Sequence, residues 1–275
     1  MGAGKTEHGA EGRWGGRLTK RPLPECDPSL DALSTGDRHE LAAVWIQRAA
    51  MERRVADAFE VIRSSLERRR ASATLVRLAT RAVDDEYRHA ELSRVVASRF
   101  AGTELEAPAR LALQLPKHAG ASPDLRDTLF VVGQCVLNET TASAFLEVCL
   151  SHAEGALAKC ALRELLSDEI DHGRIGWAHL ASLTEAGRQE VARWLLPMAF
   201  LNLRTWREHS PYNPQHRKSF SFHGAPPAEV THAALLDALR TLIVPGLKEL
   251  RMETGPLEAW LEAGAPTDRV PETER

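Results

Sequence analysis

Two short segments of the same pattern, Asp85–His89 and Asp168–His172, limit the possible folds of this chain more than any other feature. Each is a Glu-x-x-His preceded directly by Asp. On an α-helix, residues at positions i and i+3 share a face, so each segment projects a carboxylate and an imidazole toward one point. Two such helices facing each other would supply ligands of the kind that bind two iron or manganese ions. The repeat therefore predicts two facing helices with a polar centre between them.

The Glu-x-x-His pattern alone is a weak signal, and the chain contains a third copy, Glu229–His232. This copy lacks the preceding Asp and follows Pro226 and Pro227, where a helix would begin. We interpret Glu229 as a first-turn Glu stabilised by the helix dipole, and His232 as unrelated to it. The other two copies therefore need support from the residues around them.

Two further Glu residues complete the pattern, because a two-metal site in a helical bundle needs one Glu from each of two more helices. Glu52 and Glu139 lie one helix upstream of Glu86 and Glu169, and each interrupts an otherwise apolar helical face. Burying a lone carboxylate is costly, so a metal or an ionic partner is expected at both positions. For Glu52, an ion pair with Arg48 is the alternative.

Asp85 and Asp168, which directly precede the two Glu residues, are predicted to support the ligands from behind. Each lies about 100° around the helix from its neighbour. From there it can reach the free ring nitrogen of the His on the facing helix, which would fix the tautomer and orientation of that ring. The alternative is a pair of amphipathic helices whose Asp, Glu and His face water.

With these residues the chain resembles the ferritin-like superfamily of di-iron carboxylate proteins, over roughly Arg38 to Leu183. Three segments are similar to a bacterial branch of ferritin-like domain proteins: Met51–Phe59, Asn138–Thr140 and Ser167–His172. The resemblance implies two Fe ions, with Mn as the other option, and O₂ as a co-substrate. It implies these metal ligands: Glu52, Glu86, His89, Glu139, Glu169 and His172.

The chain departs from its apparent relatives at two positions. In the bacterial branch the first Glu is commonly followed by His, whereas here Arg53 follows it, and we expect that side chain near the rim of the site. Amine N-oxygenases of the superfamily carry an additional His where this chain has Leu165. The superfamily also includes ferroxidases, peroxide reductases, hydroxylases and desaturases, so the resemblance does not fix the reaction.

Ser143 and Cys135 are the candidate groups beside the centre. Ser143 lies four residues beyond Glu139 and is predicted as a catalytic, pocket-lining hydroxyl that relays a proton. Its alternative role is helix packing, with the hydroxyl bonded to the preceding turn. Cys135 lies one turn before Glu139 and either lines the pocket or fills the core. The four cysteines show no CxxC spacing, which favours free thiols over disulfides or zinc sites.

Composition favours a helical protein, since Ala, Leu, Arg and Glu dominate and only 5% of residues are aromatic. The net charge of −3 argues against a nucleic-acid binder that relies on phosphate neutralisation. No apolar run approaches the roughly 20 residues of a membrane span, and the N-terminus lacks the apolar stretch of a signal peptide. We therefore expect a cytoplasmic protein with no membrane partner.

We expect an all-α fold, a ferritin-like four-helix bundle with additional C-terminal helices. The predicted organisation is a flexible N-terminal arm (1–33), the di-metal bundle (34–183), a C-terminal helical extension packed on it (184–263) and a mobile tail (264–275). The bundle helices are expected at about 37–69, 73–100, 123–152 and 156–183, with a crossover at 103–121. In the extension we expect helices at 187–208, kinked at Pro197, at 228–251, and at 255–263. The loop 209–227 interleaves basic and aromatic residues, and it is either a lid over an anionic substrate or a surface loop.

These expectations favour an O₂-activating non-haem di-iron oxidoreductase, of the oxygenase or hydroxylase type, acting on a small organic substrate. Such an enzyme would draw on an external electron donor, and the C-terminal helices would wall its pocket or form a homodimer interface. Two alternatives stay open: a ferroxidase or peroxide-reducing iron protein without organic substrate, and a non-catalytic helical scaffold. The absence of rubredoxin-like CxxC pairs weighs against a self-contained peroxide reductase.

Overall fold

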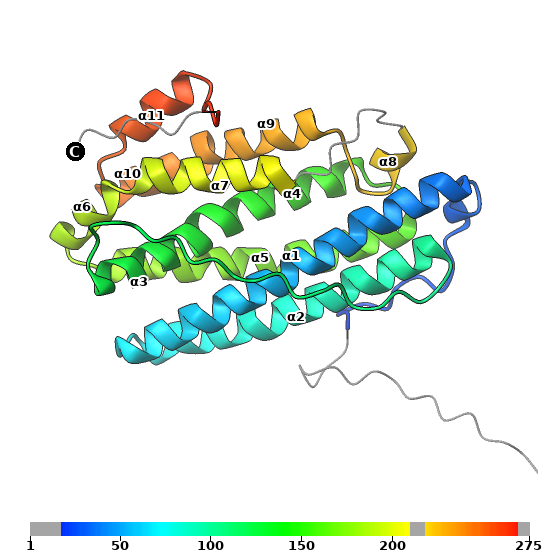
Figure 1. Ribbon diagram of the computed structural model, residues 1–275, viewed down its shortest axis with the longest axis horizontal. Helices are drawn as coiled ribbons and strands as arrows, with labels where there is room; N and C mark the ends of the chain where they lie inside the picture. Colours follow the sequence, from blue (N-terminus) through cyan, green and yellow to red (C-terminus); the bar gives the residue numbers. More distant parts are fainter. Residues whose placement is uncertain (1–17, 210–217, 269–275) are drawn as a thin grey trace, which may run out of the picture.

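The computed structural model describes residues 18–209 and 218–268. Within these ranges the chain consists of helices and loops, without any strand, so the prediction of an all-α fold is confirmed. Figure 1 shows long helices lying side by side along the long axis of the molecule.

The first long pair is formed by α1 (Thr35–Arg68) and α2 (Ala73–Ala101), which run antiparallel (Figure 1). Both helices begin at a serine cap. The hydroxyl of Ser34 accepts a hydrogen bond from the Asp37 backbone N–H at 3.1 Å, and that of Ser72 accepts one from Leu75 at 3.3 Å. Such caps satisfy backbone donors that have no partner within the helix. The predicted helix ends are therefore set by local capping chemistry.

The second pair contains an irregular helix that the sequence pattern did not predict. The segment expected as one regular helix divides into α3 (Pro123–Val131), a π-helical segment η2 (Val132–Asn138) and α4 (Glu139–His152). Its partner α5 (Ala156–Ser182) is a regular helix. The π-helical segment ends directly at Glu139, and π-helical turns are frequent at functional sites.

Two apolar clusters fill the space between α1, α2, η2–α4 and α5. One contains Leu41, Trp45, Phe100, Leu146 and Leu157. The other contains Phe59, Ile62, Val83, Cys135 and Ile175. On every one of these helices the Glu and His residues of interest fall between the two clusters along the chain. The polar centre is thus enclosed by apolar layers at both ends.

The C-terminal helices pack against the α3–η2–α4 rod. They are α6 (Glu185–Ala192), α7 (Leu195–His209), α9 (Ala228–Ala238), π-helical η3 (Leu239–Ile243), α10 (Val244–Glu249) and α11 (Gly255–Glu262). One apolar cluster joins them to η2, and it includes Val132, Val136, Leu203, Leu239 and Leu257.

Two prolines account for departures from the predicted C-terminal helices. Pro197 does not kink one helix over 187–208. It lies in the first turn of α7, where its missing N–H costs nothing. Pro245 follows η3, and the wider π turn accommodates a residue that cannot donate to the preceding turn. Within the predicted loop 209–227, residues Lys218–Phe222 form the short helix α8. Residues 210–217 of the proposed lid lie outside the described residues.

The segments expected to be flexible at the two ends are packed where the structure describes them. Residues 18–33 lie against the helices, with Leu30 buried and the Asp27 carboxylate accepting a 2.9 Å hydrogen bond from the Leu157 N–H at the start of α5. Beyond α11, Ala265 is buried and the Trp260 indole donates to the Pro266 carbonyl at 3.1 Å. Residues 1–17 and 269–275 of the predicted arm and tail lie outside the described residues.

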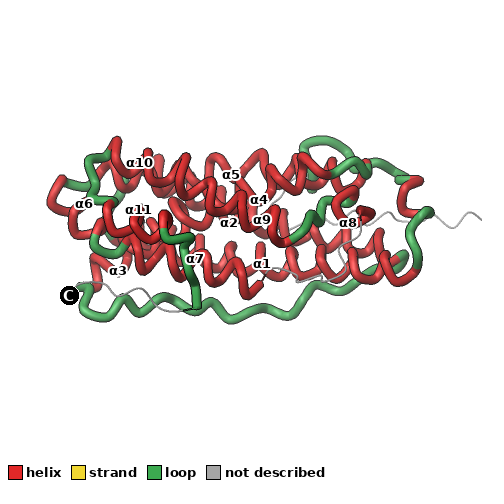
Figure 2. Tube along the Cα trace, turned by 90° about the horizontal axis from the view of Figure 1, so that it is seen from above, coloured by secondary structure: helices red, strands yellow, loops and turns green. Residues whose placement is uncertain are grey.

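The crossover between α2 and α3 runs along the length of the molecule, as Figure 2 shows. Arg110 fastens it to α1 through the buried Asp57, with a 2.9 Å hydrogen bond from Nε. Arg53 donates to the Pro108 carbonyl at 3.4 Å. Arg53 therefore holds the crossover, whereas the sequence led us to expect it at the rim of the metal site.

Within the described part of the chain, two helices are long and apolar enough, by length and composition, to cross a membrane: Pro123–His152 and Ala228–Glu249, each with a mean hydropathy of 1.3. The sequence contains no uninterrupted apolar run of that length, so no such segment was predicted. A helix can nevertheless reach this mean hydropathy when its window contains few charged residues. Core helices of soluble proteins meet the same criterion, and half of the most apolar window of Pro123–His152 is buried.

Candidate metal centre

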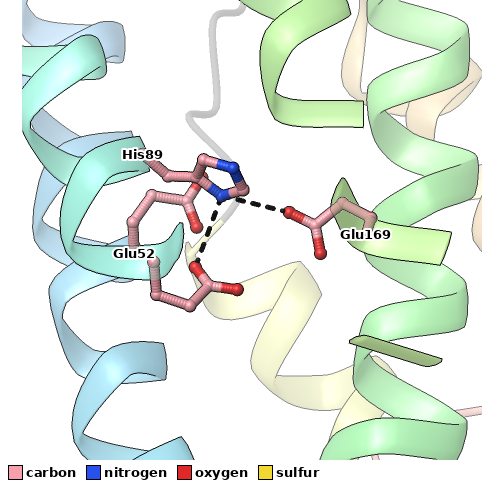
Figure 3. A group of neighbouring side chains, drawn as sticks. Glu52, His89 and Glu169 are labelled. Carbon is pink, nitrogen blue, oxygen red and sulfur yellow. Dashed lines mark ion pairs between the residues drawn. The ribbon is translucent and has the colours of Figure 1, made fainter. Parts of the chain in front are cut away.

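The structure brings the six predicted ligands together in two overlapping groups. One group consists of Glu52, Glu86, His89 and Glu169, and the other of Glu86, Glu139, Glu169 and His172. Within each group, one potential ligand atom per residue lies within 4.8 Å of all the others. Glu86 and Glu169 belong to both groups. Figure 3 shows the side chains of Glu52, His89 and Glu169 converging from three helices.

Both imidazole rings turn the same nitrogen, Nδ1, toward the shared carboxylates. The Nδ1 atom of His172 lies 2.9 Å from Glu86 Oε1 and 3.2 Å from Glu169 Oε2. The Nδ1 atom of His89 lies 3.5 Å from Glu169 Oε1 and 3.7 Å from Glu86 Oε2. The two rings therefore present Nδ1 as the ligand atom, from opposite sides of the shared pair.

The opposite nitrogen of each ring faces an aspartate on the other helix. His89 Nε2 on α2 lies 3.3 Å from Asp168 Oδ2 on α5, and His172 Nε2 on α5 lies 3.6 Å from Asp85 Oδ2 on α2. The contacts cross between the helices, as expected from the position of each Asp next to its Glu. A carboxylate at Nε2 favours the tautomer that leaves Nδ1 free for a metal.

The donor set fits a pair of divalent cations. Glu86 Oε2 and His89 Nδ1 are buried atoms without a hydrogen-bond partner among the described residues. Leaving such groups unsatisfied is costly, and a cation between them would satisfy both. Four carboxylates and two neutral imidazoles also balance the charge of two divalent ions, and mixed oxygen and nitrogen donors suit iron or manganese.

The pKa values show how strongly the groups at the centre interact. Burial raises the pKa of Glu52 and of Glu139 well above the ordinary value, and the neighbouring carboxylates add to the effect. For His89, burial disfavours the charged ring, but the hydrogen bond to Asp168 and the nearby carboxylates outweigh it and raise the pKa to about 10. For Glu86, burial is outweighed by the attraction of the nearby His172 and His89 rings, so its pKa falls to about 2. A metal cation would have to displace protons from this centre.

A group of amides around Glu139 was missed at the sequence level. The Gln134 amide donates to Glu139 Oε1, and so does Asn138 at 3.4 Å. Asn202 on α7 in turn donates to Asn138 Oδ1 at 3.3 Å. Gln134 precedes Glu139 by five positions, a spacing that shares a face only in a π-helix. A pattern search at the α-helical period therefore could not have found it.

A charged network behind the histidines was also missed, because it joins distant parts of the chain. The buried Asp168 accepts hydrogen bonds from Arg88 and, at 2.6 Å, from the half-exposed Lys20 Nζ. Arg81 lies 3.3 Å from Asp85 and 3.5 Å from Asp168. Burial raises the pKa of Asp168, but His89 and Lys20 outweigh it and hold that pKa well below its usual range.

A cavity of about 1170 Å³ opens onto the centre from the side of Glu52, Glu139 and Glu169, whereas the two histidines do not line it. Its walls come from six segments: α1, the crossover, the α3–η2–α4 segment, α5 at Glu169, α7 and α9. The polar centre thus has a closed side behind the histidines and an open side before three carboxylates.

Ser143 does not line this cavity, contrary to the prediction. On α4 the cavity is lined by Ala142, Phe145 and Leu146. Ala142 and Leu146 lie three and seven residues beyond Glu139, on the same face of this regular helix. Cys135 is fully buried in an apolar cluster and does not line the cavity either. We therefore assign neither residue a role in chemistry.

The remaining residues singled out in the sequence lie away from the ligands. The Tyr87 hydroxyl donates to Asp57 at 3.4 Å, pointing from the centre. Glu229 lies in the first turn of α9, as we interpreted it, and His232 accepts a 2.6 Å hydrogen bond from Arg207. Among the described residues no ion pair joins Arg48 to Glu52; the Arg48 guanidinium lies over the Trp45 ring, 4.3 Å from its centroid.

No protein-family model, no curated protein and no solved structure matches this chain. The resemblance to ferritin-like proteins therefore stays a prediction from the sequence motifs.

Proposed function

We propose that this protein is an O₂-activating, non-haem di-iron oxidoreductase of the oxygenase type that acts on a small organic substrate. In this proposal α1, α2, α3–η2–α4 and α5 form a ferritin-like four-helix bundle around two Fe ions, with Mn as the other option. The observation that carries the proposal is the pair of four-residue ligand groups that share Glu86 and Glu169.

The shared carboxylates are the feature that distinguishes a two-metal centre from two separate ions. In this proposal Glu86 and Glu169 would each bind both ions, because both belong to the two ligand groups. Glu52 with His89 would complete the site of one ion, and Glu139 with His172 that of the other. When bound, two reduced irons supply the redox chemistry that activates O₂. The protein holds the rings through Asp85 and Asp168 and keeps bulk water from the histidine side by burial.

The cavity favours an organic substrate over iron oxidation alone. A ferroxidase needs a path for ions, whereas cavities lined mainly by apolar and aromatic side chains are typical of small-molecule sites. Here such a cavity reaches Glu52, Glu139 and Glu169. Insertion of one oxygen atom of O₂ into a C–H bond also consumes two electrons and two protons and releases water, so the proposed reaction requires an external electron donor.

Anaerobic Fe²⁺ titration with metal analysis tests the metal centre. We expect about two irons per chain. Glu86→Ala and Glu169→Ala should lose both ions, because each removes a shared ligand, while Glu52→Ala should retain one. Glu229→Ala is the matched control from the third Glu-x-x-His and should still bind two.

The outcomes separate this proposal from its alternatives. Substoichiometric metal, or binding unchanged in Glu86→Ala, would contradict it and leave a helical scaffold. Stoichiometric iron that consumes O₂ at a rate no organic compound changes would favour a ferroxidase or peroxide-reducing protein.

A further inference from the structure

The cavity beside Glu52 and Glu139 has features that select one class of ligand. We infer that it binds an amphipathic monoanion, an elongated apolar chain with one carboxylate-type head held by Arg48. The identification of this ligand as the substrate rests on the proposed function. The inference that the cavity binds such a ligand rests on the cavity alone.

The cavity is elongated along the helices and passes the candidate metal centre. Its lining on α1 extends from Val44 to Ala58, and on the α3–η2–α4 rod from Leu129 to Leu146. At about 1.5 Å per residue, these walls span roughly 21 and 26 Å. Glu52 and Glu139 lie near the middle of their walls, so a chain that occupies the cavity would run past both carboxylates.

Apolar side chains contribute the larger part of the cavity surface. Three of the large hydrophobic residues exposed on the described surface line it: Leu111 (39% exposed), Leu115 (51%) and Leu201 (44%). Grouped exposed apolar side chains usually mark a binding surface. Deeper lining residues are also apolar, among them Phe130 and Met198. This composition fits a hydrocarbon chain better than a sugar or a nucleotide.

One end of the cavity carries a cation for which the structure describes no anionic partner. The Arg48 guanidinium lies over two aromatic rings, 4.3 Å from the centroid of Trp45 and 5.6 Å from that of Phe145. Among the described residues its Nη2 approaches only the Cys149 sulfur, at 3.9 Å, and its buried Nη1 has no hydrogen-bond partner. A buried guanidinium N–H without an acceptor is costly, and a carboxylate is the acceptor that matches its geometry.

A second arginine on the wall strengthens the preference for an anion. Arg54 also lines the cavity and makes no hydrogen bond or ion pair with any residue the structure describes. Among the other charged groups of the lining, Glu208 pairs with Arg204 at 2.7 Å, and Arg207 donates to His232. A cationic ligand head would add a positive charge beside Arg48, and a neutral one would leave the charge of the Arg48 guanidinium without a counter-ion.

Calorimetric binding of matched eight-carbon probes tests the inference on the wild-type chain. Octanoate should bind more tightly than octanol, and octylammonium should bind most weakly. Decanoate and laurate should bind progressively more tightly, by roughly fourfold per added methylene group, as burial of apolar chain requires. Octanol binding as tightly as octanoate, or no binding of any carboxylate, would overturn the inference.

Arginine variants then place the head group. Arg48→Leu should weaken octanoate binding roughly 10- to 100-fold, the loss expected for a hydrogen-bonded charge pair, while octanol binding persists. Arg48→Lys should recover part of the loss. Arg63→Leu is the matched control, since Arg63 lies on the same helix, pairs with Glu67 and does not line the cavity. Thermal melting of each variant verifies the fold.

Two results would show that the carboxylate head of the ligand binds elsewhere than at Arg48 and would overturn that assignment. A loss confined to Arg54→Leu would place the head at the other arginine. Octanoate binding that survives in Arg48→Leu but disappears on metal chelation would place it on the metal. Because binding needs neither O₂ nor turnover, iron binding without octanoate binding contradicts this inference alone, and octanoate binding without iron contradicts only the proposed function.

Discussion

At the scale of single residues, the histidine rings are held by contacts that cross between α2 and α5. Each ring has an aspartate at Nε2 and the shared carboxylates at Nδ1. Both aspartates thus face the ring of a histidine on the other helix. We therefore expect the affinity of this centre for metal to depend on the aspartates as well as on the predicted ligands.

Replacing Asp85 tests this dependence. In Asp85→Asn the neutral amide no longer favours the tautomer of His172 that frees Nδ1, so we expect metal affinity to fall roughly 10- to 100-fold with the fold intact. Competition with a chromogenic chelator measures the change. Asp84→Asn, one position earlier on the exposed face of α2, is the matched control. Equal affinity in the two variants would show that Asp85 does not orient the ligand.

Metal binding should also depend on pH. Without metal, His89 has a pKa of about 10 and the pKa of His172 is raised well above its ordinary value, so both rings hold protons near neutral pH. The pKa values of Glu52 and Glu139 are raised as well, so both carboxylates lose their protons at a higher pH than usual. A cation must displace these protons, so affinity should fall as the pH is lowered. Calorimetry in buffers of different ionisation enthalpy counts the protons released.

Raising the pH should have the opposite effect on the stability of the metal-free protein. Because the pKa of His89 is raised above its unfolded value of 6.5, its stabilising effect is complete below that value and is lost as the pH rises through about 10. His179→Asn is a control for the proton count, since burial lowers the pKa of His179 to about 4 and the ring is neutral. Metal binding with no proton release would contradict the prediction.

At the scale of elements, the π-helical segment η2 places Gln134 beside Glu139 and brings the rod close to α5. The approach is closest at Gly176 on α5. A Cβ atom there would lie 2.8 Å from Cys135 Cβ and 2.9 Å from the backbone nitrogen of Val136. Only a residue without a side chain fits against this backbone, so Gly176 and η2 form one structural unit.

Alanine substitutions on α5 test that unit. Gly176→Ala should lower the free energy of unfolding by roughly 1–3 kcal/mol, because the backbone of η2 must move. Gly173→Ala, one turn earlier, places its Cβ at an ordinary 3.7 Å from Cys135 O, and it should raise stability by up to about 1 kcal/mol through helix propensity. Urea denaturation measures both. A tolerated Gly176→Ala would show that η2 is not pressed against α5.

At the scale of the whole molecule, the C-terminal helices share an apolar cluster with η2, the segment that ends at Glu139. The helices α7 and α9 also wall the cavity. The extension and the metal centre are therefore connected through one continuous core. We expect them to unfold together in a single transition.

Neighbouring leucines in η3 test this cooperativity. Leu239 is fully buried and Leu242 is 54% exposed. Leu239→Ala should cost roughly 2–5 kcal/mol and shift the whole transition, while Leu242→Ala should stay within about 0.5 kcal/mol of the parent. Fluorescence and far-ultraviolet dichroism should follow the same curve. Two separate transitions would show that the extension is an independent unit.

The helix starts and the candidate ligands could be predicted from the sequence, because both depend on short-range periodicity and capping. The helix ends at Ser34, Ser72 and Ser122 follow from local hydrogen bonds. The ligand residues could be found because positions i and i+3 share a face on any regular helix, and Asp85 and Asp168 because one step along the helix rotates by a known angle. These relations need no knowledge of how the helices pack.

Features that join distant segments or change the helical period became visible only in the folded protein. The π turn brings Gln134 next to Glu139, and the packing between elements decides that Ala142 rather than Ser143 lines the cavity. Lys20 reaches Asp168 across most of the bundle sequence, and the cavity combines walls from six segments. Such contacts depend on packing between elements, which carries no fixed spacing along the chain, so no pattern in the sequence could have shown them.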